Sequence, residues 1–125
     1  DYDTLNILAN ELVNEVFENI MINSVHHNIN SIVEIIIKFS KEIKEGKNFI
    51  KLEFNDNGIG IPDSNKQRIF IRGDFETENV RGSGLGLKLV KKLVDLYNGK
   101  IWIEDKIKGD HSFGCNCILL FPEAI

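Results

Sequence analysis

The chain has 125 residues, of which 42% are hydrophobic, and a formal net charge of −4. This length suffices for one hydrophobic core but not for two, so we expect a single domain over residues 1–125. The negative charge excludes the basic surface that binds nucleic acid, and no apolar run reaches the length of a membrane span. The sequence starts at Asp1 without a Met, which we interpret as a fragment of a longer protein.

Hydrophobic periodicity predicts helices and strands along the whole chain. Strict alternation of apolar and polar residues indicates a strand, and apolar residues recurring every three or four positions indicate a helix. The expected elements are a strand at 4–9, a helix at 10–27, hairpin strands at 31–44 and 48–55, a short helix at 64–70, a long helix at 84–97, and strands at 100–106 and 115–121. Helices with one apolar stripe that cover one face of a mixed, mostly antiparallel sheet make a two-layer α/β (α+β) sandwich.

The first predicted helix, 10–27, carries a row of polar residues near its end. Its expected core stripe consists of Val13, Val16, Phe17, Ile20 and Met21. Asn19, Asn23 and His27 recur every four residues and therefore share one side of the helix, and His26 lies beside them. An amide oxygen there is a suitable ligand for a Mg²⁺ ion that also holds phosphates. The alternative is that the asparagines face solvent or cap the helix.

The predicted hairpin leads to an acidic residue in an unusual place. Its first strand has an apolar face made by Val33, Ile35, Ile37 and Phe39, and its turn is expected around Gly46. In the second strand Leu52 and Phe54 alternate with polar residues, and the same parity makes Asp56 face the core. A buried carboxylate needs a donor, and the amino group of adenine is a suitable one. The alternative is that the strand ends at Asn55 and that Asp56 begins the turn at Asn57-Gly58.

A second glycine pattern favours a nucleotide site. Gly82-Ser83-Gly84-Leu85-Gly86-Leu87 leads into the helix 84–97, whose expected stripe is formed by Leu85, Leu89, Leu93 and Leu96 with Val90, Val94 and Tyr97. A glycine-rich entry allows backbone N–H groups at a helix N-terminus to approach phosphate closely. The spacing differs from dinucleotide-binding and Walker-type loops. Asn98-Gly99 is a typical end for this helix.

In combination these patterns resemble the ATP-binding catalytic domain of sensor histidine kinases, which belongs to the GHKL superfamily with the Bergerat fold. The resemblance covers nearly the whole chain. It rests on an N box at Asn19–His27, a G1 box at Asp56–Gly60, an F box at Ile69-Phe70, a G2 box at Gly82–Leu87 and a terminal strand motif at Gly114–Pro122.

The resemblance implies a role for each matching residue. Asn23 supplies the magnesium ligand, Asn19 and His26 contact phosphates, and His27 packs beside the nucleotide. Asp56 accepts the adenine amino group, and Asn116 stands where a Thr often helps this contact through water. The rest of the implied nucleotide-binding set is Gly58, Gly60, Ile61, Phe70, Arg72, Arg81, Gly82, Ser83, Gly84, Leu85, Gly86 and Leu87.

The implied activity is transfer of the γ-phosphoryl group of Mg²⁺-bound ATP to a histidine on a separate helical dimerisation domain, which then serves a response regulator. No histidine of this chain is a suitable acceptor. Position 19 is Asn where hydrolysing relatives carry Glu, and Glu18 lies about 100° around the helix, which argues against an ATPase. Two alternatives remain: an anti-sigma-type serine kinase of the same fold, and a nucleotide-binding interaction module without transfer.

The two cysteines fit an intracellular domain. Cys115 and Cys117 are two residues apart on a predicted strand, so they face the same side and are poorly placed for a disulfide. We expect both to be reduced, semi-buried side chains. The implied location is the cytoplasm, either for a soluble kinase or for the cytoplasmic part of a membrane-bound sensor, without membrane contact by this domain.

Overall fold

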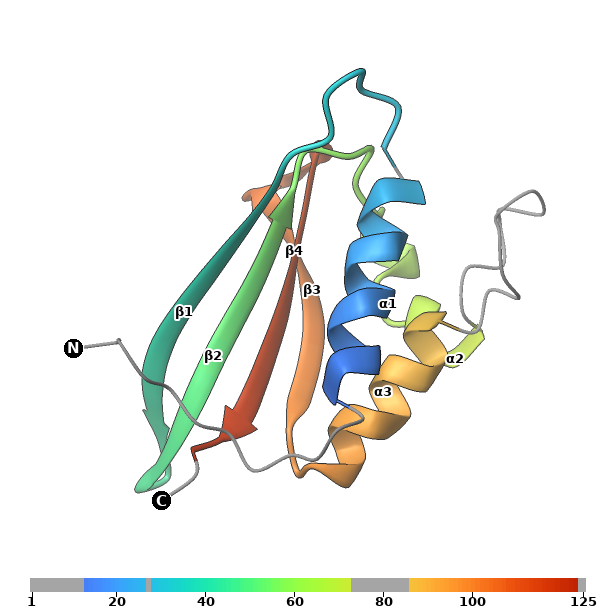
Figure 1. The fold of residues 1–125 in the computed structure, drawn as a ribbon. Helices are drawn as coiled ribbons and strands as arrows, with labels where there is room; N and C mark the ends of the chain where they lie inside the picture. The colour runs from blue at the N-terminus through green and yellow to red at the C-terminus, as the bar shows by residue number, and fades with distance from the viewer. Residues whose placement is uncertain (1–12, 27, 73–85, 124–125) are drawn as a thin grey trace.

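A four-stranded antiparallel sheet and the helices that cover one of its faces make up the structure (Figure 1). The computed structural model describes residues 13–26, 28–72 and 86–123. In chain order the elements are α1 (Val13–His26), β1 (Ile35–Lys44), β2 (Lys47–Asp56), the 3-10 helix η1 (Asp63–Asn65), α2 (Ile69–Arg72), α3 (Gly86–Leu96), β3 (Lys100–Ile107) and β4 (Asp110–Pro122). The strand order is β1-β2-β4-β3. The predicted two-layer fold is confirmed.

Several element bounds differ from the sequence prediction. β1 begins at Ile35 instead of residue 31, and β4 begins at Asp110 instead of residue 115. β4 is longer because Gly109, with φ of 86°, closes a tight hairpin with β3. The short helix expected at 64–70 is divided into η1 and α2. The strand expected at 4–9 lies outside the described residues.

Two tight turns follow the sequence signals. Glu45 and Gly46 both have positive φ, 51° and 76°, and they join β1 to β2 where Lys44 pairs with Lys47. Asn98 has φ of 60° just after α3, and the N–H of Gly99 donates to the carbonyl of Val94 at 2.9 Å. The helix end at Asn98-Gly99 is therefore confirmed.

The core lies between the sheet and the two long helices. Inward side chains of β2 and β4, including Phe54 and Phe121, meet Val16 of α1 and Val90 of α3, all at most 3% exposed. Both long helices lie along the same face of the sheet (Figure 1), and α1 contacts α3 more extensively than it contacts the sheet. In the described residues no helix is long and apolar enough to cross a membrane.

Each helix buries a slightly different stripe from the predicted one. Met21 of α1 is 40% exposed, and Ser24 takes a buried position instead. The reason is that α1 packs mainly against α3. The buried side of α1 is therefore formed by Val16, Ile20 and Ser24.

The stripe of α3 differs in the same way. Leu89 and Leu96, both expected in the core, are exposed, and Leu87 joins the buried face formed by Val90, Leu93, Val94 and Tyr97. Helical periodicity alone does not say which side of a broad apolar surface meets the sheet.

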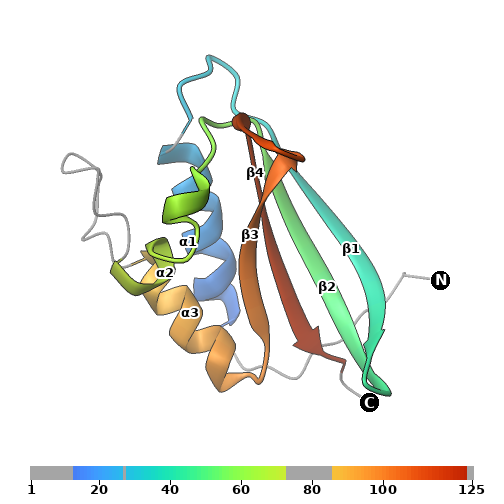
Figure 2. The ribbon, with the colours of Figure 1, turned by 180° about the vertical axis from the view of Figure 1, so that it is seen from behind.

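The apolar face predicted for the first hairpin strand is largely exposed. Ile37 and Phe39 pair with the inward residues Phe54 and Leu52, yet they are 39% and 57% exposed. Seen from behind (Figure 2), β1 lies at the edge of the sheet farthest from the helices, and β3 lies nearest to them. The described helices therefore do not cover β1, and only Ile35 packs against the core.

Candidate functional site

Asp56, the last residue of β2, is a buried carboxylate on the helix-covered face of the sheet. It is 4% exposed and continues the inward series of Leu52 and Phe54, as the alternation predicts. Its Oδ1 accepts the backbone N–H of Gly58 at 3.0 Å and of Cys115 at 3.2 Å, and its Oδ2 accepts the Cys115 thiol at 3.2 Å. Donors from two segments thus hold the carboxylate, while Oδ2 keeps a lone pair for a ligand.

Both sequence interpretations of Asp56 describe part of this geometry. The residue is the last inward position of a strand, because its backbone still pairs with Ile35. Its hydrogen bond to Gly58, two residues ahead, is also that of an Asx turn. The side chain therefore stabilises the turn and keeps an acceptor facing the core layer.

Strand β4 reaches Asp56 through Gly114 and Cys115. Gly114 has φ of 112°, and a Cβ there would lie 2.1 Å from the carbonyl oxygen of Asp56. Such an approach requires glycine for both its conformation and its lack of a side chain. It brings the N–H and the thiol of Cys115 onto the carboxylate.

Asn116 does not lie beside Asp56, so its expected contact with adenine through water has no support in this geometry and stays a prediction. Successive residues of a strand face opposite sides, and Asn116 faces the side without helices, where its Nδ2 donates to Glu53 Oε1 at 2.9 Å. The residue beside Asp56 is Cys115, which the sequence interpretation missed. Counting back in steps of two from the buried Leu119 would have shown that Cys115 faces inward.

The loop after Asp56 is anchored on both sides. Asn57 Oδ1 accepts Asn28 Nδ2 at 2.6 Å and the N–H of Glu34 at 2.9 Å, which ties the loop to the segment before β1. On the other side Gly60 has φ of 76°, and a Cβ there would lie 1.5 Å from the carbonyl oxygen of His111. The close approach of His111 therefore requires glycine at position 60, whereas the expected contact of Gly60 with the nucleotide remains a prediction.

Apolar residues follow this loop and pack into the hydrophobic core. Ile61 packs against the core cluster, and Ile69 and Phe70 of α2 are each 8% exposed. Arg72 is the last residue of α2. The F-box residue Phe70 thus joins the same core as Asp56, through the short helix that leads to residue 73.

The polar row of α1 lies along one flank of its buried stripe. Asn19, Asn23 and His26 are all half-buried. Phe17, on the other flank, contacts Phe54 of β2 with ring centroids 6.0 Å apart. Asn19 Nδ2 donates to the carbonyl of Glu15 at 2.7 Å, which leaves its amide oxygen available. The structure thus separates the apolar and polar flanks as the helical spacing predicts.

Of the second glycine pattern, the structure describes Gly86, where α3 begins, and Leu87, which is 5% exposed. The predicted site residues His27, Arg81, Gly82, Ser83, Gly84 and Leu85 lie outside the described residues. Their expected contacts with the nucleotide remain predictions.

The donor set near α1 fits a magnesium ion bound together with phosphates. In the described residues no group of three His, Cys, Asp or Glu side chains is arranged to hold a metal ion. An amide oxygen from Asn23 is a hard ligand, and Mg²⁺ is usually bound by one or two protein oxygens with phosphate and water completing the shell. Asn23 is therefore a suitable single protein ligand.

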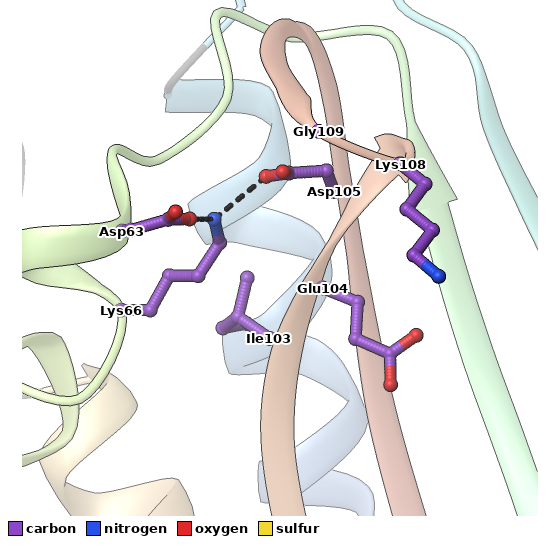
Figure 3. A pocket seen from close by; sticks show the side chains of 7 residues that line it. All are labelled: Asp63, Lys66, Ile103, Glu104, Asp105, Lys108 and Gly109. Carbon is purple, nitrogen blue, oxygen red and sulfur yellow. Dashed lines mark hydrogen bonds and ion pairs between the residues drawn. The ribbon is translucent and has the colours of Figure 1, made fainter.

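A charged cluster lies near Asp56, in an open hollow between η1 and the β3–β4 hairpin (Figure 3). Lys66 Nζ pairs with Asp105 Oδ1 at 2.7 Å and also with Asp63. Burial lowers the pKa of Lys66, but the hydrogen bonds that its ammonium group donates to Asp105 and Asp63 outweigh this effect, so that the pKa is raised above its usual value. Sequence reasoning missed this cluster because Asp105 is far along the chain from Asp63 and Lys66.

Both cysteines are free and buried in the structure. Burial raises the pKa of the Cys115 thiol far above its ordinary range, and the nearby Asp56 charge raises it further. The same causes raise the pKa of Cys117. Each thiol therefore stays protonated, and that of Cys115 acts as a hydrogen-bond donor.

Comparison with known families agrees with this arrangement. Residues 9–125 match the family described as histidine kinase-, DNA gyrase B-, and HSP90-like ATPases. The chain belongs to this family.

The similar proteins are sensor kinases. The chain is 38% identical over 72 residues to the sensor histidine kinase AruS of Pseudomonas aeruginosa, a match that covers 54% of this chain and 7% of AruS. The fold is similar to the mycobacterial sensor histidine kinase MprB, with a TM-score of 0.71, 21% identity, and coverage of 87% of this chain and 68% of MprB. It is also similar to full-length ShkA in complex with AMPPNP, with a TM-score of 0.69, 21% identity, and coverage of 97% of this chain and 24% of ShkA. The chain thus spans a small part of its curated relatives.

Proposed function

We propose that this chain is the ATP-binding catalytic domain of a sensor histidine kinase. It binds Mg²⁺ with ATP or ADP and presents the γ-phosphoryl group to a histidine on a separate helical dimerisation domain. That domain then passes the phosphoryl group to a response regulator. The relatives that match this chain are sensor kinases, which supports a cytoplasmic domain of such a protein.

The observation that carries the proposal is the buried acceptor at Asp56. A carboxylate that is 4% exposed, and whose three hydrogen bonds come from Gly58 and Cys115, keeps an acceptor available in an otherwise apolar layer. The amino group of adenine is a donor, whereas the equivalent atom of guanine is an acceptor. The site therefore selects adenine, because a buried acceptor facing another acceptor loses about 1–3 kcal/mol.

Transfer in this arrangement depends on positioning and charge neutralisation. Asn23 would hold Mg²⁺, which supplies neutralisation of the phosphate charge when it is bound. Asn19 and His26 would orient the phosphates from the same flank of α1. The chain has no carboxylate at position 19 to activate water, so we infer that the attacking group comes from the partner domain.

The first test is nucleotide selection, measured by titration calorimetry of ADP and GDP with Mg²⁺. We expect ADP to bind at least tenfold more tightly than GDP, a factor that corresponds to about 1.4 kcal/mol. Asp56→Asn should remove most of this preference, because an amide can donate as well as accept. Equal affinity of the wild-type chain for both nucleotides would contradict the adenine site.

The second test is transfer of radiolabelled γ-phosphate. The chain alone should neither label itself nor release phosphate rapidly. Acid-labile label should appear on the histidine-bearing domain of the same protein when that domain is added. Rapid phosphate release by the chain alone would indicate an ATPase instead. Acid-stable label on a serine of a partner would indicate a serine kinase of the same fold.

A further inference from the structure

The ion pair between Lys66 and Asp105 is buried to an unusual degree for two charged groups. Their side chains are 14% and 12% exposed, whereas Asp63, the second partner of Lys66, is 89% exposed. Figure 3 shows the Lys66 ammonium group between the two carboxylates, reaching from the segment after η1 toward β3. Removing one member of such a pair leaves an uncompensated buried charge.

Asp105 lies on the same face of the sheet as the adenine acceptor. In the β3–β4 register Asp105 is the direct partner of Cys115, and Cys115 donates both its N–H and its thiol to Asp56. The two carboxylates therefore flank one cysteine from the strands on either side of β4. Two strand spacings separate those strands by about 10 Å. At that distance, with little solvent between them, like charges repel appreciably.

We propose that Lys66 is a positioning residue for the adenine acceptor, because its ammonium group neutralises Asp105, whose uncompensated charge would otherwise repel the Asp56 carboxylate across Cys115. This inference rests on the proposed binding of adenine at Asp56. Lys66 does not touch the nucleotide in this role. It acts through Asp105, whose uncompensated charge would otherwise displace the Asp56 carboxylate from the donors of Gly58 and Cys115.

The other charged and titratable groups around the pair do not replace Lys66. Asp63 belongs to η1 and shares the ammonium group, and Glu104 and Lys108 line the opposite side of the hollow. Lys66 is the cation whose ion pair with Asp105 the structure shows. The elements packed around the pair also carry Glu53, Asp56, Arg68, Lys106, Asp110, His111, Cys115 and Cys117.

The test measures binding of two ligands to the 125-residue chain by titration calorimetry with Mg²⁺: ADP, and purine riboside 5′-diphosphate, which lacks the amino group that Asp56 accepts. Lys66→Gln keeps a polar side chain of similar length but removes the charge. We expect it to weaken ADP binding about three- to tenfold and to change binding of the analogue less than twofold. A loss shared equally by both ligands would overturn the proposal, because a general structural defect affects both.

Matched variants separate the effect of the Lys66 charge on ADP binding from the effect of its side-chain packing. Asp105→Asn and the double variant Lys66→Gln/Asp105→Asn should both bind ADP within twofold of the wild type, because neither contains the unpaired Asp105 charge. Lys66→Arg should do the same. Persistent weak binding in the double variant would overturn the proposal. If Lys66→Gln does not fold, Lys66→Arg and the double variant still test the proposal. Loss of the preference for ADP over the analogue in either variant would refute a charge-neutralising role of Lys66.

The same experiment separates this inference from the proposed function. If the wild-type chain does not prefer ADP to the analogue, the adenine site itself is wrong. If the wild type shows the preference and Lys66→Gln retains it fully, only the positioning role of Lys66 is refuted.

Discussion

Gly114→Ala tests whether β4 closes on the adenine acceptor as tightly as the structure indicates. The new Cβ would lie 2.1 Å from the carbonyl oxygen of Asp56 and 3.2 Å from the Cα of Asn57, at a backbone φ of 112°. A Cβ essentially never lies within 3.0 Å of an oxygen, so one of the two strands must move by about 1 Å. That movement separates Cys115 from the carboxylate that it contacts at 3.2 Å.

The loss of unfolding free energy expected for Gly114→Ala has two parts, one from backbone conformation and one from the new atomic contact. A non-glycine residue at positive φ costs about 1–2 kcal/mol. Forcing a side chain into a packed position costs about 1–3 kcal/mol more. The matched control is Gly109→Ala, because Gly109 has a φ of 86° with no atom within 4 Å of its added Cβ, so only the conformational part applies.

Urea unfolding of the two variants gives the difference directly. Gly114→Ala should lose about 2–5 kcal/mol of unfolding free energy and Gly109→Ala about 1–2 kcal/mol. Calorimetry should also show weaker ADP binding in Gly114→Ala and unchanged binding in Gly109→Ala. If both variants lose the same unfolding free energy and bind ADP equally well, β4 does not close on Asp56, and the close contact between Gly114 and the Asp56 carbonyl is wrong.

Two further predictions concern the metal and the buried thiols. Asn23→Ala should weaken ADP binding on the order of tenfold with Mg²⁺ present and less than twofold with EDTA; an equal loss in both conditions would exclude a role in metal binding. Burial raises the pKa of the Cys117 thiol far above its ordinary value of 9.0, so the unfolded chain releases this proton above about pH 9 while the folded chain keeps it. Stability therefore falls as the pH rises, by about 1.3 kcal/mol between pH 8 and pH 10 for this thiol. In urea unfolding the stability difference between the wild type and Cys117→Ala should shrink by that amount, and a constant difference would show that the thiol is not buried.

The sequence determined the features that depend on neighbouring residues. Alternation along β2 predicted an inward Asp56, and helical spacing placed Asn19, Asn23 and His26 on one flank of α1. The turn at Glu45-Gly46 also followed from local chemistry. Backbone geometry alone sets these periods, so they can be predicted without knowledge of the rest of the fold.

Tertiary structure decided which surfaces and side chains meet. The exposure of Leu89 and Phe39 reflects where the helices lie over the sheet, which no local pattern specifies. Cys115 lies beside Asp56, where Asn116 was expected, because of the register of β4. A shift of one residue in this register would exchange the two faces of the strand. The pairing of Lys66 with Asp105 likewise requires η1 and β3 to be brought together by packing, because charges distant in sequence have no common period.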